Sequence, residues 1–297
     1  MTGGAVAGSR PDWVSDTMFP FESKFHRTSS GHQMHYVDEG SGEPIVFVHG
    51  NPAWSFEFRH LIAELRTQHR CVAADHIGFG LSSRSDQNHD HHPNAHAARF
   101  ESFVLELDLR DLTLYVNDWG GPIGLDFARK HPDRVKNLII ANTWCWPVSS
   151  DRHFRFFSSL MASRLGQYLI ARRTYFVKGV MPRAVADRKT LTPEVMAHYL
   201  NALPDPRSRA ACAALPGFIV GASEWLESIW NDRAAFTGKP TLLLWGSKDI
   251  AFRLKELEQW KSEMSQFEAH VFDDCGHFVA EEVPQRALPL IRDLLRK

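Results

Sequence analysis

The chain has 297 residues, of which 34 are basic and 35 acidic, so its formal charge at pH 7 is −1. A charge this close to zero gives no electrostatic reason to expect nucleic acid or an anionic membrane as a partner. The length and a hydrophobic share of 43% are enough for a large core, either in two domains or in one α/β domain that carries an insertion.

The cysteines Cys71, Cys145, Cys212 and Cys275 lie far apart and form no C-x-x-C pair. This pattern is not typical of a zinc site or a disulfide framework, and it favours reduced thiols in the cytoplasm. No apolar run approaches the roughly 18 residues that a membrane span needs. The first residues are small and polar and lack the apolar stretch of a signal peptide, so we interpret 1–15 as a flexible tail.

In the first half of the chain, the expected elements alternate between strand and helix. Strands are expected at Met34–Val37, Pro44–Val48, Cys71–Ala74, Leu112–Val116 and Val135–Ala141, and helices at Ser55–Leu65, Ala95–Leu107 and Ile123–Lys130. The glycine-containing turn at 39–42 favours direct pairing of the first two strands. This alternation predicts a mostly parallel sheet with helices on both faces.

The alternation stops after about Thr143, where residues 146–232 show mostly helical patterning broken by prolines. The earlier pattern then returns as strands and helices at Pro240–Trp245, Lys255–Met264, Glu268–Phe272 and Val283–Leu295. The sequence therefore predicts a core domain made of residues 1–145 and 233–297, with 146–232 inserted as a helical cap.

An aspartate occupies the turn after the strand at Leu112–Val116, in the segment Asn-Asp-Trp-Gly-Gly (117–121). Strand, tight turn and helix in this order have the layout of the nucleophile elbow of α/β-hydrolases, with Asp118 at the nucleophile position. A carboxylate is ionised at neutral pH and needs no base in order to attack. Because it can displace a leaving group and become an alkyl ester, Asp118 favours displacement at an sp³ carbon or epoxide opening over acyl transfer.

Covalent chemistry at Asp118 also needs a base and an acid that orients the base. His277 is the candidate base, because it follows a glycine directly after the last expected strand. Asp249 is the candidate acid, because it follows a buried strand and sites in α/β sheets gather at the carboxyl ends of strands. The other position for an acid, after the preceding strand, holds Asn142. A histidine in a surface loop and an aspartate in a turn are the structural alternatives.

Asn51 and Trp119 are the candidate donors for negative charge that develops during the reaction. Their backbone N–H groups would form an anion hole, and their carboxamide and indole are neutral donors suited to a departing chloride or bromide in a dry pocket. The structural alternatives are a turn residue for Asn51 and a core aromatic for Trp119.

Together these segments resemble the haloalkane dehalogenases. The resemblance rests on Val-His-Gly-Asn-Pro-Ala-Trp-Ser-Phe (48–56), Ala-Asp-His-Ile-Gly-Phe-Gly-Leu-Ser (74–82), Val-Asn-Asp-Trp-Gly-Gly-Pro (116–122), Leu-Leu-Trp-Gly-Ser-Lys-Asp (243–249) and Gly-His-Phe (276–278). It covers about 34–145 and 235–297 and is much weaker over the cap. Asn51 and Trp119 together with a late Asp249 are similar to the third subfamily. The implied fold is an α/β-hydrolase core with a helical cap, without cofactor or metal.

The resemblance implies hydrolysis of carbon–halogen bonds in halogenated alkanes to an alcohol, a halide ion and a proton. Asp118 would attack the carbon, Asn51 and Trp119 would hold the halide, and His277, oriented by Asp249, would activate water. The implied partners are a small halogenated hydrocarbon, water and the halide, with no nucleic acid and no membrane. Self-association remains a hypothesis, based on nine tryptophans and an aromatic-rich cap.

Three other functions remain open from the sequence. An epoxide hydrolase would use the same aspartate with cap tyrosines as acid, and Tyr168, Tyr175 and Tyr199 supply that residue type. Luciferase-like oxygen chemistry and a catalytically inactive binding protein are possible on the same scaffold. The donor pair suits a halide better than an alkoxide, and the complete set of nucleophile, acid and base argues against an inactive protein.

Two further segments are singled out. Residues 88–96 depart from the family pattern with four histidines and an aspartate, a composition typical of a metal site or, more often, of a solvated loop. Several apolar cap residues can line a pocket, but at their spacing most are expected to pack in the core and none is assigned to the site. They are Phe154, Phe156, Phe157, Met161 and Phe176.

Overall fold

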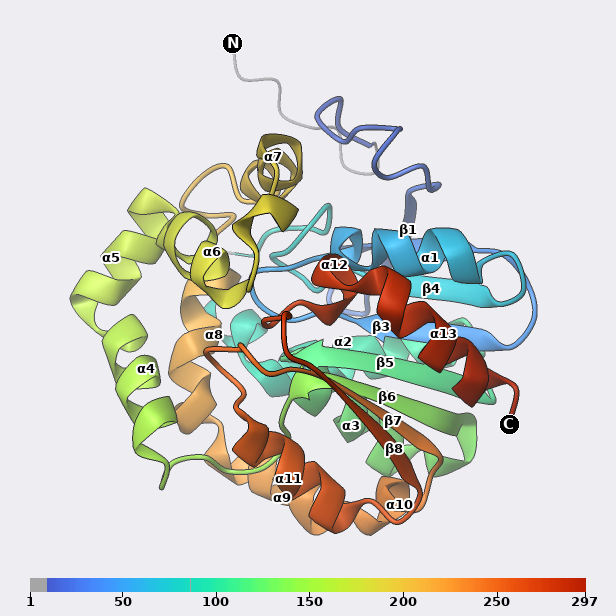
Figure 1. The fold of residues 1–297 in the computed structure, drawn as a ribbon. Coiled ribbons are helices and arrows are strands. Elements are labelled where there is room, and N and C mark those ends of the chain that lie inside the picture. The colour runs from blue at the N-terminus through green and yellow to red at the C-terminus, as the bar shows by residue number, and fades with distance from the viewer. Residues whose placement is uncertain (1–9, 86) are drawn as a thin grey trace.

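The computed structural model describes residues 10–85 and 87–297. Within these residues the strands form one eight-stranded sheet in the order β1-β2-β4-β3-β5-β6-β7-β8 (Figure 1). The β1–β2 and β2–β4 pairs are antiparallel, and all other pairs are parallel. The strands are β1 (Lys24–Arg27), β2 (Gln33–Glu39), β3 (Pro44–Val48), β4 (Arg70–Ala74), β5 (Leu112–Asp118), β6 (Val135–Thr143), β7 (Thr241–Gly246) and β8 (Phe267–Phe272).

Helices cover both faces of this sheet (Figure 1). The α-helices are α1 (Arg59–Leu65), α2 (Pro93–Glu106), α3 (Gly120–Lys130), α4 (Arg152–Ala162), α5 (Arg164–Arg173), α6 (Met181–Ala184), α7 (Pro193–Asn201), α8 (Ala210–Gly221), α9 (Ser223–Asn231), α10 (Ala234–Thr237), α11 (Leu254–Glu263), α12 (Val279–Glu282) and α13 (Pro284–Leu295). Shorter helical turns are η1 (Ser55–Phe58), η2 (Asn88–His91), η3 (Pro132–Arg134), η4 (Phe176–Val180) and η5 (Arg188–Thr190). None of the helices described is long and apolar enough to cross a bilayer.

The central strands explain why the sheet is covered on both faces. β3, β5, β6 and β7 are almost continuously apolar, and nearly all their side chains are buried. Strands of this kind need a layer on each side. The helices α1, α12 and α13 contact one another on one face, while α2, α3, α9 and α10 form the other layer. This arrangement confirms the α/β fold class predicted from the sequence.

The edge of the sheet near the N-terminus differs from the sequence prediction. β2 and β3 are strands as expected, but they do not pair, because β4 lies between them and pairs with both. The turn that joins them contains Gly40 and Gly42, both with positive φ. These glycines signal a turn, but a local turn signal does not determine which strand becomes the partner. The half-buried β1 was not predicted, and the helix expected at Ser55–Leu65 is divided into η1 and α1.

Residues 10–15, which were expected to belong to a flexible tail, make specific contacts instead. The Arg10 guanidinium donates to the carbonyl oxygens of Phe19 at 2.5 Å and Phe21 at 2.7 Å. The backbone N–H of Ser15 donates to Nε2 of His198 in α7 at 3.1 Å, and Val14 is buried. The same expectation covered residues 1–9, which lie outside the residues that the structure describes.

The helices α4 to α8 lie between β6 and β7 in the chain and beside the carboxyl ends of the parallel strands (Figure 1). The inserted helices contact a buried ion pair of the sheet domain, in which Arg59 of α1 donates to both carboxylate oxygens of Glu281 in α12, at 2.6 and 2.5 Å. The Tyr199 hydroxyl of α7 donates to the same carboxylate at 3.0 Å. Since all three groups are buried and mutually bonded, they fix α7 against the sheet domain.

Candidate active site

Asp118 is the last residue of β5, directly before α3. Its φ of 49° lies in the left-handed region, which non-glycine residues seldom adopt. The strain is held by the surrounding structure, since the Thr143 hydroxyl donates to the Asp118 carbonyl oxygen. The backbone therefore turns sharply and presents the Asp118 side chain at the carboxyl end of the sheet.

Two glycines allow this turn to pack closely. A Cβ atom on Gly120 would collide with the carbonyl oxygen of Val48 at the end of β3, and one on Gly50 would collide with the Asp118 carboxyl group. Neither position tolerates a side chain unless the backbone moves. Gly120 of the elbow is thus explained by the close approach of β3, and its neighbour Gly121 by the close approach of Thr143 at the end of β6.

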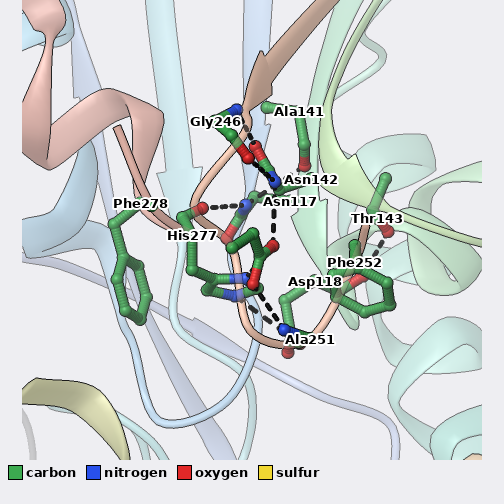
Figure 2. A network of polar contacts seen from close by, with 12 residues as sticks. Asn117, Asp118, Ala141, Asn142, Thr143, Gly246, Ala251, Phe252, His277 and Phe278 are labelled. Atoms are coloured by element: carbon green, nitrogen blue, oxygen red, sulfur yellow. Dashed lines mark hydrogen bonds and ion pairs between the residues drawn. The ribbon is translucent and has the colours of Figure 1, made fainter. Parts of the chain in front are cut away.

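The structure brings the three predicted catalytic residues together, and Figure 2 shows two of them, Asp118 and His277, side by side. Nδ1 of His277 lies 2.8 Å from Oδ2 of Asp249, and Nε2 lies 3.7 Å from Oδ2 of Asp118. Asp249 also accepts hydrogen bonds from the side chain of Asn142 at 2.8 Å and the backbone of Ala251 at 2.7 Å. Because a carboxylate is acceptor-only, Nδ1 carries a proton and donates to Asp249, which directs Nε2 towards Asp118.

Charge and burial set the protonation of this group. Burial raises the pKa of Asp118, while His277 and the backbone N–H groups of Asn51 and Trp119 oppose that rise. Burial lowers the pKa of His277, but the carboxylates of Asp249 and Asp118 outweigh it and raise that pKa to about 9. At neutral pH the resting site therefore holds an imidazolium beside the carboxyl group of Asp118.

The two oxygens of Asp118 have different surroundings. Oδ1 accepts the backbone N–H of Asn51 at 2.7 Å, and the backbone N–H of Trp119 also hydrogen-bonds this carboxyl group. Oδ2 is the oxygen nearer to His277. The two N–H groups, one from the loop after β3 and one from the N-cap of α3, form an anion hole, which leaves Oδ2 as the oxygen able to attack a substrate.

The predicted halide donors lie at the same place. The Asn51 carboxamide nitrogen donates one hydrogen to the carbonyl oxygen of Cys212 in α8 at 3.1 Å, which leaves its second hydrogen available. The Trp119 ring packs edge-on against Trp144 at 4.8 Å, and its indole N–H has no hydrogen-bond partner among the described residues. Four of the five predicted site residues border one cavity, and they are Asn51, Asp118, Trp119 and His277. Asp249 is not part of the cavity wall and contacts His277 instead.

This cavity lies between the sheet domain and the helices α4 to α8. Its wall is mostly apolar, and besides these four site residues it is formed by Pro52, His153, Phe154, Phe157, Phe176, Val180, Met181, Ala184, Pro216, Ile219, Ile250, Ala251, Phe252 and Phe278. An apolar wall excludes water from the carboxylate and strengthens its interactions with the few polar groups present.

Most of the apolar cap residues pack in the core, as expected, since Phe154, Met161 and Phe176 belong to the buried hydrophobic cluster. Phe154, Phe157 and Phe176 line the cavity. Met161 is buried outside the cavity wall, whereas the Phe156 side chain is 72% exposed. Helical spacing marks a shared face, but it does not indicate whether that face borders packed side chains, a cavity or solvent.

Two asparagines support the site in ways that sequence reasoning missed (Figure 2). Asn142 exchanges hydrogen bonds with the backbone of Gly246 and donates to Asp249. Asn117 donates to the backbone carbonyl of His277 at 3.2 Å. Both are polar residues that end apolar strands, and this is the sequence signal that could have identified them. From the sequence, Asn142 was considered only as an alternative position for the catalytic acid, where a carboxylate is missing.

Glu57 is the third residue missed. It is fully buried in η1, and neither carboxyl oxygen has a hydrogen-bond partner among the described residues. Burial raises its pKa to about 8, a rise that the imidazolium of His277 opposes. A glutamate between Phe56 and Phe58 was the available signal, because an ionisable residue in an apolar run is unusual.

Replacing Glu57 by glutamine is expected to flatten the pH dependence of stability. Because the pKa of Glu57 is higher in the folded than in the unfolded chain, the contribution of this residue to the free energy of unfolding is fully present below pH 4.5. It is lost as the pH rises to about 8, at up to about 1.4 kcal/mol per pH unit. The amide cannot ionise, so the free energy of unfolding of Glu57→Gln should fall less steeply over that range. Chemical denaturation at several pH values measures the difference, and parallel curves for parent and variant would contradict the assignment.

The histidine-rich segment 88–96 is not a solvated loop, contrary to the expectation. Asp90, His91 and His96 are buried, and Arg99 donates to Asp90 at 2.6 Å. The segment forms η2 and the start of α2, where His91 and His96 pack inside the fold while His89 is exposed. No group of three or more histidine, cysteine, aspartate or glutamate residues in the described part of the chain is placed to hold a metal ion.

Comparison with known proteins agrees with this geometry. Residues 43–175 and 216–284 match the alpha/beta hydrolase fold family. The chain is 39% identical to haloalkane dehalogenase 2 of Mycobacterium tuberculosis over 273 residues, which are 91% of this chain and 93% of that protein. It is also 30% identical to the cis-3-alkyl-4-alkyloxetan-2-one decarboxylase of Xanthomonas campestris pv. campestris over 295 residues, covering 94% and 97% of the two chains.

Among solved structures, haloalkane dehalogenase DatA from Agrobacterium tumefaciens C58 superimposes with a TM-score of 0.82 at 27% identity. The match covers 95% of this chain and 99% of DatA. The identity to the Mycobacterium dehalogenase exceeds that to the decarboxylase, and both the sequence and the fold match almost end to end. The chain therefore belongs to the haloalkane dehalogenases, within the α/β-hydrolase fold family.

Proposed function

We propose that this protein hydrolyses the carbon–halogen bond of halogenated alkanes through a covalent ester on Asp118. One observation carries the proposal: an ionised carboxylate, a histidine and two neutral donors face the same apolar cavity. Oδ2 of Asp118 lies 3.7 Å from Nε2 of His277, with Asn51 and Trp119 in the cavity wall.

In the first step, Oδ2 of Asp118 forms a bond to the halogen-bearing carbon as the carbon–halogen bond breaks. The halide leaves with the bonding electron pair, opposite the attacking oxygen. The free carboxamide hydrogen of Asn51 and the indole N–H of Trp119 are the donors that receive it. Because the cavity is apolar, these two hydrogen bonds replace part of the water that would otherwise solvate the ion.

In the second step, water attacks the carboxyl carbon of the ester on Asp118. Nε2 of His277 takes a proton from the water, and the backbone N–H groups of Asn51 and Trp119 hold the oxyanion that forms on Oδ1. Collapse of this intermediate releases the alcohol and restores the Asp118 carboxylate. Asp249 stabilises the imidazolium formed in this step through its bond to Nδ1.

The electrostatics of the site support this order of events. The negative charge of Asp118 is one of the causes that raise the pKa of His277. Formation of the ester removes this charge, so the pKa of His277 falls once the ester is present. The histidine can then lose its proton and act as a base at neutral pH, at the stage when a base is required.

The cavity offers little support for the epoxide hydrolase alternative. Tyr199 donates its hydroxyl to Glu281, and the Tyr168 side chain is half exposed on the outer surface. None of the described tyrosines, Tyr175 included, lines the cavity. A cap tyrosine that acts as an acid would have to reach the substrate. Hydrolysis of a carbon–halogen bond is therefore better supported than hydrolysis of an epoxide.

A panel of substrates tests the proposal. Brominated and chlorinated alkanes are assayed for halide release, with epoxides assayed for diol and a cis-3,4-dialkyl oxetan-2-one for carbon dioxide. The oxetanone is included because of the Xanthomonas relative named above. Bromide release in repeated turnovers supports the dehalogenase assignment. Diol or carbon dioxide in the absence of any halide release would refute it and identify the alternative.

Replacement of Asp249 by asparagine is expected to lower turnover by a factor on the order of 10² to 10⁴, because the amide can donate to Nδ1 and favour the wrong tautomer of His277. The loss should lie mainly in ester hydrolysis, while the first halide is released at nearly the parent rate. Rapid-quench kinetics separates the two steps. Activity within a few-fold of the parent would place the acid elsewhere.

Residues 146–232 are proposed as a cap that closes over the site, supported by the contribution of α4, α6 and α8 to the cavity wall. A cytoplasmic location is proposed from the cysteines, all four of which are buried and free. The expected partners are the halogenated substrate, water and the halide ion. Self-association remains a hypothesis for size-exclusion chromatography with light scattering to test.

A further inference from the structure

The charges of this protein are distributed unevenly. Between Arg152 and Ala186 the chain contains six arginines and one lysine but no aspartate or glutamate, which leaves a formal charge of −8 on the other residues. All seven cations are exposed, and none forms an ion pair with a described residue. The overall charge of −1 gave no reason to expect binding to an anionic membrane. It is, however, the sum of one strongly positive segment and a negative remainder.

Large apolar side chains are exposed among these cations. Phe156 is 72% exposed, Leu165 63%, Tyr168 51% and Leu160 44%. These four make up half of the exposed large hydrophobic side chains in residues 10–85 and 87–297, and they lie within thirteen consecutive positions. Such clustering differs from the scattered exposed apolar residues of an ordinary soluble surface.

Helix geometry places these groups on the outer side of α4 and α5. On α4, Arg152, Arg155 and Phe156 recur at helical spacing and line a shallow surface depression together with Ser159. The opposite side of α4 carries Phe154 and Phe157, which face the active-site cavity. Both helices lie at the outer edge of the molecule, away from the sheet (Figure 1).

We propose that this outer face of α4 and α5 docks on the surface of an anionic lipid membrane. The five arginines of these two helices complement lipid headgroup charge, and arginine can keep its guanidinium among headgroups while its alkyl stem lies against acyl chains. Phe156, Leu160, Leu165 and Tyr168 supply apolar surface that enters the boundary between headgroups and acyl chains. A nucleic acid would complement the charge but offers no hydrocarbon layer to these four side chains.

The experiment is co-sedimentation of the full-length protein with vesicles. Vesicles of phosphatidylglycerol mixed with phosphatidylcholine are compared with vesicles of phosphatidylcholine alone, at low and high salt. Binding is expected to the anionic vesicles, to be weaker at high salt and to be lost with the neutral lipid. Each cation near an anionic surface is worth roughly a fivefold change in affinity, so Arg155→Ala with Arg164→Ala should weaken binding roughly twenty-five-fold.

Two further variants separate the contributions. Phe156→Ser with Leu165→Ser should weaken vesicle binding but retain its salt dependence, since the charges remain. Arg292→Ala with Arg296→Ala makes the same change in charge within and directly after α13, on the other side of the molecule, and should bind like the parent (Figure 1). Turnover of a short, water-soluble bromoalkane should be unchanged in all three variants, because none of the altered residues lines the cavity.

The proposal fails if no vesicle binds, if neutral and anionic vesicles bind equally, or if the α4–α5 variants bind like the α13 control. Unchanged binding after loss of Phe156 and Leu165 would also overturn it, since attraction to any polyanion would then be sufficient. Oligomers that dissociate in the Phe156→Ser and Leu165→Ser variant, without vesicle binding by the parent, would instead make this face a contact between copies. Loss of bromoalkane turnover would concern the proposed enzyme activity and leave the membrane result to be judged separately.

Discussion

Alanine in place of Asp118 is expected to abolish halide release, with a loss of turnover on the order of 10⁴-fold or more. The reaction proposed here has no other nucleophile for the carbon, because the two donors only hold the departing halide and His277 acts on the ester that Asp118 has already formed. Halide release from a bromoalkane, followed with an ion-selective electrode, measures the loss. Tight binding of substrate should remain, since the apolar wall of the cavity is unchanged.

The choice of control for Asp118→Ala follows from the backbone. With φ at 49°, position 118 lies where alanine is strained and asparagine is better tolerated. Asp118→Asn also retains an oxygen for the backbone N–H of Asn51, so it should fold with nearly the parent stability and still lack the nucleophile. Turnover within about a hundredfold of the parent in this variant would remove Asp118 from the mechanism.

The catalytic residues were predictable because each follows a strand. Parallel strands in one sheet end at the same edge, so Asp118, Asp249 and His277 had to meet if the strands were assigned correctly. The central strands are almost entirely apolar and are bounded by turns, so their positions could be predicted from the sequence. The residues expected at the ends of these strands are therefore in contact in the structure. For example, Nδ1 of His277 lies 2.8 Å from Asp249.

Other features could not be predicted because they depend on partners distant in sequence. Whether β2 pairs with β3 or with β4 is decided by burial across the sheet, although the glycines of the connecting turn favoured the local pairing. The buried Glu57 and the cavity-lining Phe157 depend on how the helices fold back over the sheet. Sequence periodicity indicates that a face is apolar, but it does not indicate what covers that face.

Replacement of His277 by phenylalanine is expected to stop the enzyme after one halide per active site. Alkylation needs only the carboxylate of Asp118 and the donors, whereas hydrolysis of the ester needs Nε2 as a base. A ring of similar size suits the position, because His277 packs against Phe252 at 5.7 Å and Phe278 at 4.6 Å between ring centres. Asp249 loses one partner but retains its hydrogen bonds from Asn142 and Ala251.

The stalled ester is detected directly by mass spectrometry of the peptide that contains Asp118, which should gain the mass of the alkyl group. His277→Gln serves as a second variant with a polar side chain and should stall in the same way. In the parent, the imidazolium of His277 lowers the pKa of Asp118, and both changes remove this charge. The pKa of Asp118 should therefore rise in both variants. As the pH is lowered, release of the first halide should then stop at a higher pH than in the parent. Continued turnover, or one equivalent of halide without an adduct on Asp118, would show that the covalent intermediate lies elsewhere.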